Sequence, residues 1–396
     1  MLEFGFKDIK FVDKGDIVRA VFLKHYYFDM NSSNLYKISP YKVEKGKIFF
    51  DEGKKVERDF SRLLSRGFNE LTNTITGRKT VYIHSNSGIP LIGTSYFGIV
   101  DRNTNLIELR SNTACNLNCI YCSLNEGGKK AVDYVVEKDY LVAQLQKLIE
   151  FKQDEDIEIH INPQGEPLLY APLTELVQDV SKIEAVKRIS IDTNAVLLTK
   201  QKADELINAG ITMFNISIDS LNPEKSKEIA GCNYPAEKLK EIISYIAEKG
   251  RVIIAPLFLP GINDKDIEEL IEFAKKIEIP VGIQNFLRYK HGKNPIKGIS
   301  MSDFYEKLKV LEKKHNIKLV YSATDFGIHK TKTLPPPFEK EEVVECEYVS
   351  MGRRNDEILG VARDRVIEIT DVKKKKNCLA KIIRKKHNIF RATQVG

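Results

Sequence analysis

The sequence is poor in the residues that mark several common classes of protein. It has no tryptophan, seven histidines and only six cysteines in 396 residues. Three of these cysteines are scattered through the chain, so we do not expect the disulfide framework of a small secreted domain. The scattered residues are Cys232, Cys346 and Cys378, and we expect them to be inert small side chains.

Long apolar runs are also lacking. The longest, near Val252–Pro260, is short and contains prolines, and the first residues lack the apolar core of a signal segment. We therefore expect no membrane span and no secretory signal, and we predict a cytoplasmic protein. A chain of this length can bury a large core divided among two or three domains.

The remaining three cysteines lie close together. Cys115, Cys119 and Cys122 directly follow the apolar stretch 106–109, on a loop that leaves a predicted strand. Three thiolates can hold three irons of a [4Fe–4S] cluster and leave the fourth iron open to another ligand. Structural zinc normally takes four ligands, often as two separated pairs, and the sequence offers no obvious second pair. We favour the cluster over zinc.

The surroundings of these cysteines resemble a known family. The spacing CxxxCxxC, with the aromatic Tyr121 before the last cysteine, is similar to the radical S-adenosylmethionine (SAM) superfamily. Four further segments match motifs of that family in the same order. They are 164–169 (QGEPLL), 192–198 (DTNAVLL), 215–220 (NISIDS) and 260–264 (PGIND). Two of them depart from the family pattern: Gln replaces the first glycine of GGEPLL, and Ala195 replaces the glycine of TNGxLL.

The resemblance implies two cofactors, a [4Fe–4S] cluster and SAM. Cys115, Cys119 and Cys122 would ligate the cluster, and SAM would bind the open iron through its amino and carboxylate groups. Glu166 would accept a hydrogen bond from the SAM ammonium, and Gly165 would allow a close approach because it has no side chain. The implied reaction is reductive cleavage of SAM to a 5′-deoxyadenosyl radical, which abstracts a substrate hydrogen.

Three further residues are candidates for SAM contacts. Ser217 is placed to bind the SAM carboxylate, or else to satisfy the backbone at the end of a strand. Asn194 contacts SAM or substrate, or else serves only to turn the chain, because Ala195 occupies a position where glycine is usual. The backbone of Tyr121 would contact adenine while its ring covers the cluster. The motifs identify no residue that acts directly on the substrate.

The middle of the chain alternates short apolar strands with helical patterns. Strands are expected at 106–110, 157–161, 188–192, 213–218, 252–257 and 281–286, and helices at 140–151, 200–209, 236–249 and 266–277. The mostly apolar runs suit strands that are buried on both faces of a parallel sheet. The pattern predicts an α/β fold with a partial (β/α)6 TIM-like barrel. Every motif lies at or just beyond the C-terminal end of a strand, where such barrels build active sites.

Composition divides the chain into three predicted domains. Residues 1–104, with short apolar pieces broken by glycine and lysine, predict a small β-rich N-terminal domain. Residues 105–333 would form the partial barrel. The prolines 335–337 indicate a stiff linker, after which residues 338–396 would form a separate basic β domain.

The excess positive charge lies in the last part of the chain. The net charge is +7, and the residues from Cys346 onward carry 13 Lys and Arg against 6 Asp and Glu. The preceding residues balance at 49 against 49, so this segment carries the whole excess, including the run Lys373–Lys376. Its strand-like alternation predicts that it is folded.

The same segment resembles a TRAM-type small β-barrel, on the pattern Gly352-Arg353, Gly360 and 363–367. The resemblance implies a domain that delivers RNA to a modification enzyme. A basic barrel face binds nucleic acid mainly through phosphates, although a lysine-rich surface can also be simply solvated. The whole chain resembles a group of archaeal radical SAM proteins that carry such a tail.

Three functions remain open from the sequence. We predict a radical SAM enzyme that modifies a base in tRNA or other RNA, with a ferredoxin or flavodoxin as reductant. The alternative is an enzyme of small-molecule or cofactor biosynthesis, similar to the GTP cyclase of molybdopterin synthesis, with a structural tail. A third possibility is an iron–sulfur RNA-binding or redox-sensing protein that does not cleave SAM.

Overall fold

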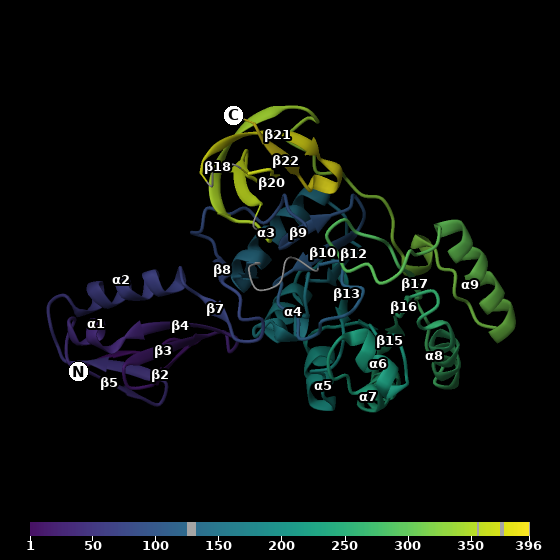
Figure 1. Cartoon of the computed structure of the whole chain (residues 1–396), viewed down its shortest axis with the longest axis horizontal. Coiled ribbons are helices and arrows are strands. Elements are labelled where there is room, and N and C mark those ends of the chain that lie inside the picture. The colour runs from purple at the N-terminus through teal and green to yellow at the C-terminus, as the bar shows by residue number, and fades with distance from the viewer. Residues whose placement is uncertain (125–131, 355, 373–375, 396) are drawn as a thin grey trace.

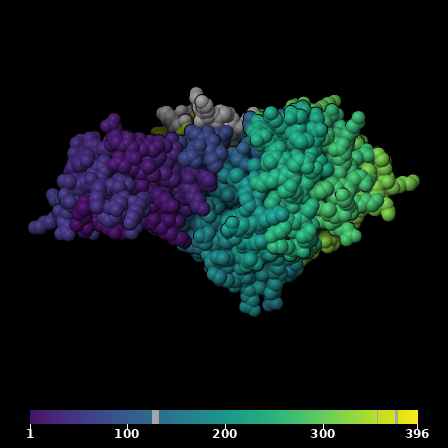
Figure 2. Space-filling model, turned by 90° about the horizontal axis from the view of Figure 1, so that it is seen from below, coloured from purple at the N-terminus to yellow at the C-terminus, as the bar shows by residue number. Residues whose placement is uncertain are grey.

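The structure is a computed structural model that describes residues 1–124, 132–354, 356–372 and 376–395. Lys373–Lys375 of the predicted basic run lie outside the described residues. Figure 1 shows an N-terminal part in purple, a central α/β part in teal and green, and a C-terminal barrel in yellow. In Figure 2 the N-terminal part projects from one side of the remainder. No helix in the described ranges is long and apolar enough to cross a membrane.

Two antiparallel sheets and one long helix form the N-terminal part. One sheet contains β1 (Leu2–Phe4), β6 (Lys47–Phe50) and β5 (Tyr41–Glu44). The other contains β2 (Ile9–Asp13), β3 (Ile17–Phe22), β4 (Tyr26–Asn31) and β7 (Thr72–Asn73). Helix α1 (Ser32–Tyr36) follows β4, and α2 (Val56–Phe68) carries Phe60, whose ring contacts Phe4, Phe11 and Phe50. This buried ring therefore joins the helix to strands of both sheets.

The central part is built on one six-stranded sheet and has the expected α/β architecture. Its order is β15 (Arg251–Ile254), β14 (Met213–Ile216), β13 (Val186–Thr193), β12 (Ile157–Ile161), β10 (Leu106–Arg110) and β9 (Gly98–Asp101). Neighbours from β10 to β15 are parallel, and β9 pairs antiparallel with β10 at the edge. The sequence did not predict β9.

The sixth predicted strand, 281–286, is much reduced. Val281 makes an isolated bridge with Ile254, and only β17 (Gln284–Asn285) forms a short parallel pair with β16 (Leu257–Phe258). Another short parallel pair joins β8 (Thr80–Ile83) to β11 (Asp133–Val136). Both β8 and β9 lie before residue 104, yet they pair with strands that follow it.

Helices cover one face of the central sheet. Four of them match the expected positions: α3 (Lys138–Lys152), α5 (Lys200–Ala209), α7 (Ala236–Lys249) and α8 (Asp264–Lys276). Not foreseen were α4 (Leu173–Ser181), α6 (Pro223–Ala230), α9 (Met301–His315) and the short 3-10 turns η2 (Pro167–Leu169), η3 (Ala323–Phe326) and η4 (Lys386–Asn388). At the start of α5, the Thr199 hydroxyl accepts a hydrogen bond from Lys202 N.

The strands of the central sheet are largely buried on both faces, as expected, but only one of these faces is apolar. In β12, Ile157, Ile159 and Ile161 belong to the main hydrophobic core, while Glu158 and His160 alternate with them on the other face. The same alternation continues in β13 and β14. Successive side chains of a strand point to opposite faces, so the helices cover an apolar face and the concave face of the sheet is polar. The site described below lies on this concave face.

The C-terminal part is a closed five-stranded barrel with its own core. The order around it is β18 (Val343–Met351), β19 (Ile358–Ala362), β20 (Arg365–Thr370), β22 (Arg391–Val395) and β21 (Cys378–Arg384). The β20–β22 pair is parallel and the other pairs are antiparallel. Ten buried residues, including Cys346 and Phe390, form a hydrophobic cluster separate from the main core. Cys346 is therefore a packing residue, as its sequence position predicted.

Much of the positive charge of this barrel is paired. Arg363 lies 2.6 Å from Glu342, Lys381 lies 2.5 Å from Glu341, and Lys385 pairs with Glu339. These glutamates precede Cys346, where the sequence count began. The segment 338–345 adds one lysine and four glutamates, so the predicted domain 338–396 carries +4 rather than +7. The basic surface is therefore smaller than the charge count alone suggests.

A strap of residues 89–98 fastens the barrel to the central sheet. Val366 N donates to Ile92 O at 3.0 Å, and Phe390 N donates to Gly93 O at 2.8 Å. Gly93 has φ +136, and a Cβ added there would lie 2.1 Å from Val366 O. The strap can approach β20 this closely only because residue 93 has no side chain.

Polar contacts strengthen the same interface. Glu368 of β20 is fully buried and accepts hydrogen bonds from Thr94 Oγ1 at 2.7 Å and Ser95 N at 3.0 Å. The buried Arg353 contacts the fully buried Asp133 of β11 at 3.0 Å. Removing either partner of a buried ion pair leaves an uncompensated charge, so the barrel is an integral part of the structure.

We predict that Gly93→Ala loosens the barrel from the strap. The new Cβ would collide with Val366 O, and such overpacking costs about 1–3 kcal/mol. The matched control is Gly88→Ala, directly before the strap, because Gly88 also has positive φ (+68) but open space around it. Urea unfolding should show a larger loss for G93A than for G88A. Equal losses would contradict this account of the interface.

Candidate functional site

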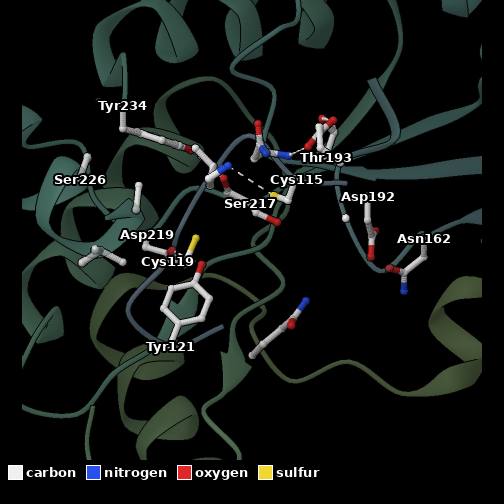
Figure 3. A pocket seen from close by; sticks show the side chains of 17 residues that line it. Cys115, Cys119, Tyr121, Asn162, Asp192, Thr193, Ser217, Asp219, Ser226 and Tyr234 are labelled. Atoms are coloured by element: carbon white, nitrogen blue, oxygen red, sulfur yellow. Dashed lines mark hydrogen bonds between the residues drawn. The ribbon is translucent and has the colours of Figure 1, made fainter. Parts of the chain in front are cut away.

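A cavity of about 230 Å³ opens where the parallel strands end. Its lining comes from the loops that follow β10, β12, β13 and β14, together with β17. Figure 3 shows these side chains converging on one space. Seven of the eight predicted site residues line it: Cys115, Cys119, Tyr121, Gly165, Glu166, Asn194 and Ser217. Cys122 follows on the same loop but is not part of the lining.

The cysteine loop is fastened to the end of α6. Asn118 N donates to Ala230 O at 3.0 Å, and Ile120 N donates to Ile229 O at 2.9 Å. A Cβ on Gly231, which has φ +66, would lie 2.2 Å from Asn118 O. The Ala230-Gly231 pair of the sequence therefore has a physical role, because only glycine leaves room for the loop.

The cysteines of this loop are half-buried, and their thiols are close enough to affect one another electrostatically. Burial raises the pKa of Cys115 to about 12, with the charges of Glu166 and Cys122 adding to the effect. Burial also raises the pKa of Cys119, and Asp219, Cys115 and Cys122 raise it further. Thiolates in such a place need an added positive group, and a metal centre supplies one.

This donor set fits an iron–sulfur cluster. Three soft sulfur ligands lie on one loop, and two of them line the cavity, which leaves room for a further ligand on that side. In the described part of the chain, the structure has no group of three or more His, Cys, Asp or Glu side chains arranged around a single metal ion. The three cysteines therefore lie near one another, but their side chains do not converge on a single metal position.

Glu166 connects the QGEPLL motif, to which it belongs, with the DTNAVLL motif through hydrogen bonds. Its side chain is 1% exposed, and Oε1 accepts hydrogen bonds from Thr193 Oγ1 at 2.6 Å and from Leu168 N at 3.0 Å. Oε2 accepts from Asn194 N at 2.9 Å. Burial raises the pKa of Glu166 to about 7 in spite of these three donors. Thr193 also lines the cavity, and the sequence analysis did not single it out although it lies inside the DTNAVLL motif.

Gly165 is needed for packing within the protein. A Cβ there would lie 2.2 Å from Ala114 O, and the next residue, Glu166, donates from its backbone N to the same oxygen at 2.7 Å. The sequence predicted that a ligand approaches this glycine. In the structure the residue that comes this close is Ala114, immediately before Cys115.

Asn194 turns the chain and also contacts the cysteine loop. Its Oδ1 accepts from Val196 N at 3.1 Å, and its Nδ2 donates to Asn116 Oδ1 at 2.9 Å. Ala195 has φ +55, a left-handed conformation that favours glycine. The backbone of this turn therefore has the left-handed conformation that glycine usually adopts, although residue 195 is alanine.

A second group of polar residues surrounds Cys119. Tyr121 Oη donates to Asp219 Oδ2 at 2.5 Å, and Asp219 Oδ1 accepts from Leu257 N at 2.8 Å. Burial raises the pKa of Asp219 to about 6. Figure 3 shows Tyr121, Asp219 and Cys119 together at one end of the cavity. Asp219 belongs to the NISIDS motif, so the sequence carried a signal for it.

Ser217 lies between this group and the rest of the cavity. Its backbone N donates to Thr193 O at 2.9 Å, and its carbonyl accepts from Tyr234 Oη at 2.8 Å. The backbone at this strand end is therefore satisfied without the Ser217 hydroxyl. Tyr234, which the sequence did not indicate, also lines the cavity.

Comparisons with known proteins agree on one family. The profile of the Radical SAM superfamily matches residues 110–274. The uncharacterized protein MJ0103 of Methanocaldococcus jannaschii is 39% identical over 364 residues, which cover 83% of each chain. A GTP 3′,8-cyclase of Peptoclostridium acidaminophilum is 31% identical over 221 residues, which cover 54% of this chain and 65% of that enzyme.

Solved structures show more distant likenesses. TYW1 with a lysine–pyruvate adduct bound has a TM-score of 0.42 and 17% identity, over 60% of this chain and 82% of that chain. Streptococcus suis SuiB bound to S-adenosylmethionine has a TM-score of 0.42 and 14% identity, over 80% of this chain and 72% of that chain.

We predict that the cysteine loop alone holds the iron. After anaerobic reconstitution, Cys115→Ala, Cys119→Ala and Cys122→Ala should each lose most of the bound iron and the visible absorbance of the cluster. The matched control is Cys232→Ala, because Cys232 Sγ lies 3.9 Å from Asn116 O, beside the same loop. Full iron content after all three loop cysteines become alanine would refute the assignment.

We also predict that Thr193 stabilises the buried carboxylate. Thr193→Val keeps the shape but removes the donor to Glu166, and a hydrogen bond to a charged group contributes about 1.5–3 kcal/mol. Thr193→Ser retains the hydroxyl and serves as the control. At a pH well above the Glu166 pKa of about 7, where the carboxylate is charged, urea unfolding without cofactors should show T193V to be less stable than T193S by about this amount. Equal stability of the two variants would rule out the role.

Proposed function

Because the chain belongs to the radical SAM superfamily, we propose that it is an enzyme that modifies a base in RNA. Its cofactors are a [4Fe–4S] cluster and SAM. What we propose beyond the chemistry of the family is the substrate, a base in RNA. The observation that carries it is the closed C-terminal barrel, which is fixed to the edge of the central sheet beside β9 and β10.

Cys115, Cys119 and Cys122 would hold the cluster, leaving one iron for SAM. When bound, these cofactors supply the reductive cleavage of SAM and a carbon radical for hydrogen abstraction. Glu166 holds the turn after β13 through its hydrogen bond from Asn194 N. We propose a ferredoxin or flavodoxin as the electron donor.

The topology of the barrel supports nucleic-acid binding. Small five-stranded barrels of the OB type bind oligonucleotides on their second and third strands and adjacent loops, and we propose that this barrel is of that TRAM or OB type. In this chain the strap 89–98 contacts β20, the third strand. We propose that RNA binds instead at the two ends of β21, where Lys376 and Lys386 are exposed.

A free nucleotide is the second candidate substrate. The observation that favours it is the 31% identity with a GTP 3′,8-cyclase over 221 residues. In that case the barrel would have a structural role and would not bind the substrate. The two candidates share a purine or pyrimidine base with a phosphate.

The test is the formation of 5′-deoxyadenosine by the anaerobically reconstituted full chain. We expect total RNA to stimulate it and to acquire a modified nucleoside that mass spectrometry detects. Stimulation by GTP with no effect of RNA would favour the second candidate and overturn the first. Removing the barrel is not a suitable test, because it would leave the buried Asp133 without Arg353.

Charge reversal on the intact chain tests the role of the barrel directly. Lys376→Glu with Lys386→Glu should weaken RNA binding by about tenfold at moderate salt, since each substitution removes a phosphate partner and adds repulsion. The matched control is Lys37→Glu with Lys54→Glu, two exposed lysines of the N-terminal part. Equal RNA affinity of the two double variants would show that the barrel does not bind RNA through these lysines.

A further inference from the structure

One acidic side chain of the cavity has no part in the cofactor site described above. Asp192, at the end of β13, lines the cavity, and its side chain is 31% exposed. Figure 3 places Asp192 and Asn162 at the end of the cavity away from Cys119. Ile161 and Ile191 are partners in the sheet, so Asn162 and Asp192 follow side by side. Gln284 of β17 also lines this cavity.

Polar contacts within the protein hold the carboxylate of Asp192 in one orientation. Oδ2 lies 3.2 Å from His160 Nε2, and Oδ1 accepts from Asn215 Nδ2 at 2.8 Å. On the other side of the imidazole, Nδ1 lies 2.8 Å from Ser190 Oγ, which itself donates to Glu158 Oε1 at 2.7 Å. Because the Ser190 hydrogen is used in that bond, Nδ1 of His160 must donate. Nε2 faces the Asp192 carboxylate, and an imidazolium, which donates from both nitrogens, satisfies both contacts.

Asp192 and His160 each stabilise the charged form of the other. Burial alone would raise the pKa of Asp192, but His160 and Asn215 hold it below the ordinary value. Burial alone would lower the pKa of His160, but Asp192 raises it. Asp192 is therefore an ionised carboxylate held in one orientation at the edge of an open cavity.

The remaining acceptor positions of Asp192 define what it can bind. A carboxylate has about four acceptor positions, and within the described residues one position on each oxygen is taken. One position on each oxygen is left, which matches a ligand with two adjacent N–H donors. Guanine presents such a pair, N1–H and the exocyclic amino group, beside its O6 acceptor. Adenine presents a donor beside an acceptor, and cytosine presents an amino group beside an acceptor.

We propose that Asp192 binds the N1–H and N2–H groups of a guanine base, with the amide of Asn162 or Gln284 donating to O6. The cavity then holds the base at one end and the cysteine loop at the other. The inference rests on the proposed function for a nucleotide substrate and deepens it by naming the base. It assigns His160 and Asn215 as positioning residues for Asp192.

The experiment compares guanine with hypoxanthine, which lacks the exocyclic amino group. Binding of GMP, IMP and AMP to the SAM-loaded, reconstituted full chain is measured anaerobically by calorimetry. One hydrogen bond to a charged group corresponds to about tenfold or more in affinity. We expect the wild-type protein to bind GMP at least that much more tightly than IMP or AMP. Asp192→Asn should lose the preference, and Asp51→Asn, at an exposed position, should retain it.

A second arm distinguishes RNA from a free nucleotide as the source of the base. It uses the RNA pentamers AAGAA and AAIAA, where I is inosine. A preference for guanine in the pentamers only assigns RNA, and a preference in the mononucleotides only assigns a small nucleotide. Equal affinities in both arms for the wild-type protein, or an unchanged preference in D192N, would overturn the inference. RNA-stimulated formation of 5′-deoxyadenosine would be unaffected by that outcome, so the two proposals fail separately.

Discussion

A single buried carboxylate connects the parts of this site. Burying a charge is costly unless donors surround it, and Glu166 has three, from the hydroxyl of Thr193 and the backbone of Leu168 and Asn194. Its own backbone N donates to Ala114. The loops after β10, β12 and β13 are therefore held in one arrangement, and every ligand in the cavity meets that arrangement already formed.

The sequence predicted the chemistry of the site better than its surroundings. The motifs lie where the strands end, and seven of the eight named residues line one cavity. The polar face of the sheet was missed, although the alternation of isoleucine with Glu158 and His160 is visible in the sequence. The strands are largely buried on both sides, as we expected, but their period of two marks one of the two faces as polar.

Other features depend on partners that are distant in the chain. β9 lies in a glycine-rich segment and becomes a strand because it pairs with the edge of β10. The sixth strand shrinks to β17 because only Val281 and two further residues find partners. The C-terminal lysines and arginines were counted as a free basic surface, yet Glu339, Glu341 and Glu342 neutralise several of them. No local pattern reveals such pairings.

The contacts of the strap also constrain the order in which the parts of the protein can fold. Thr94 and its acceptor Glu368 are 274 residues apart, so the strap leaves the ribosome long before β20 exists. During that interval the strap amides, the edge of β9 and the carboxylate of Asp133 have no barrel to cover them. Domains fold as they emerge during synthesis, so the central sheet would form first and the barrel would close over it last.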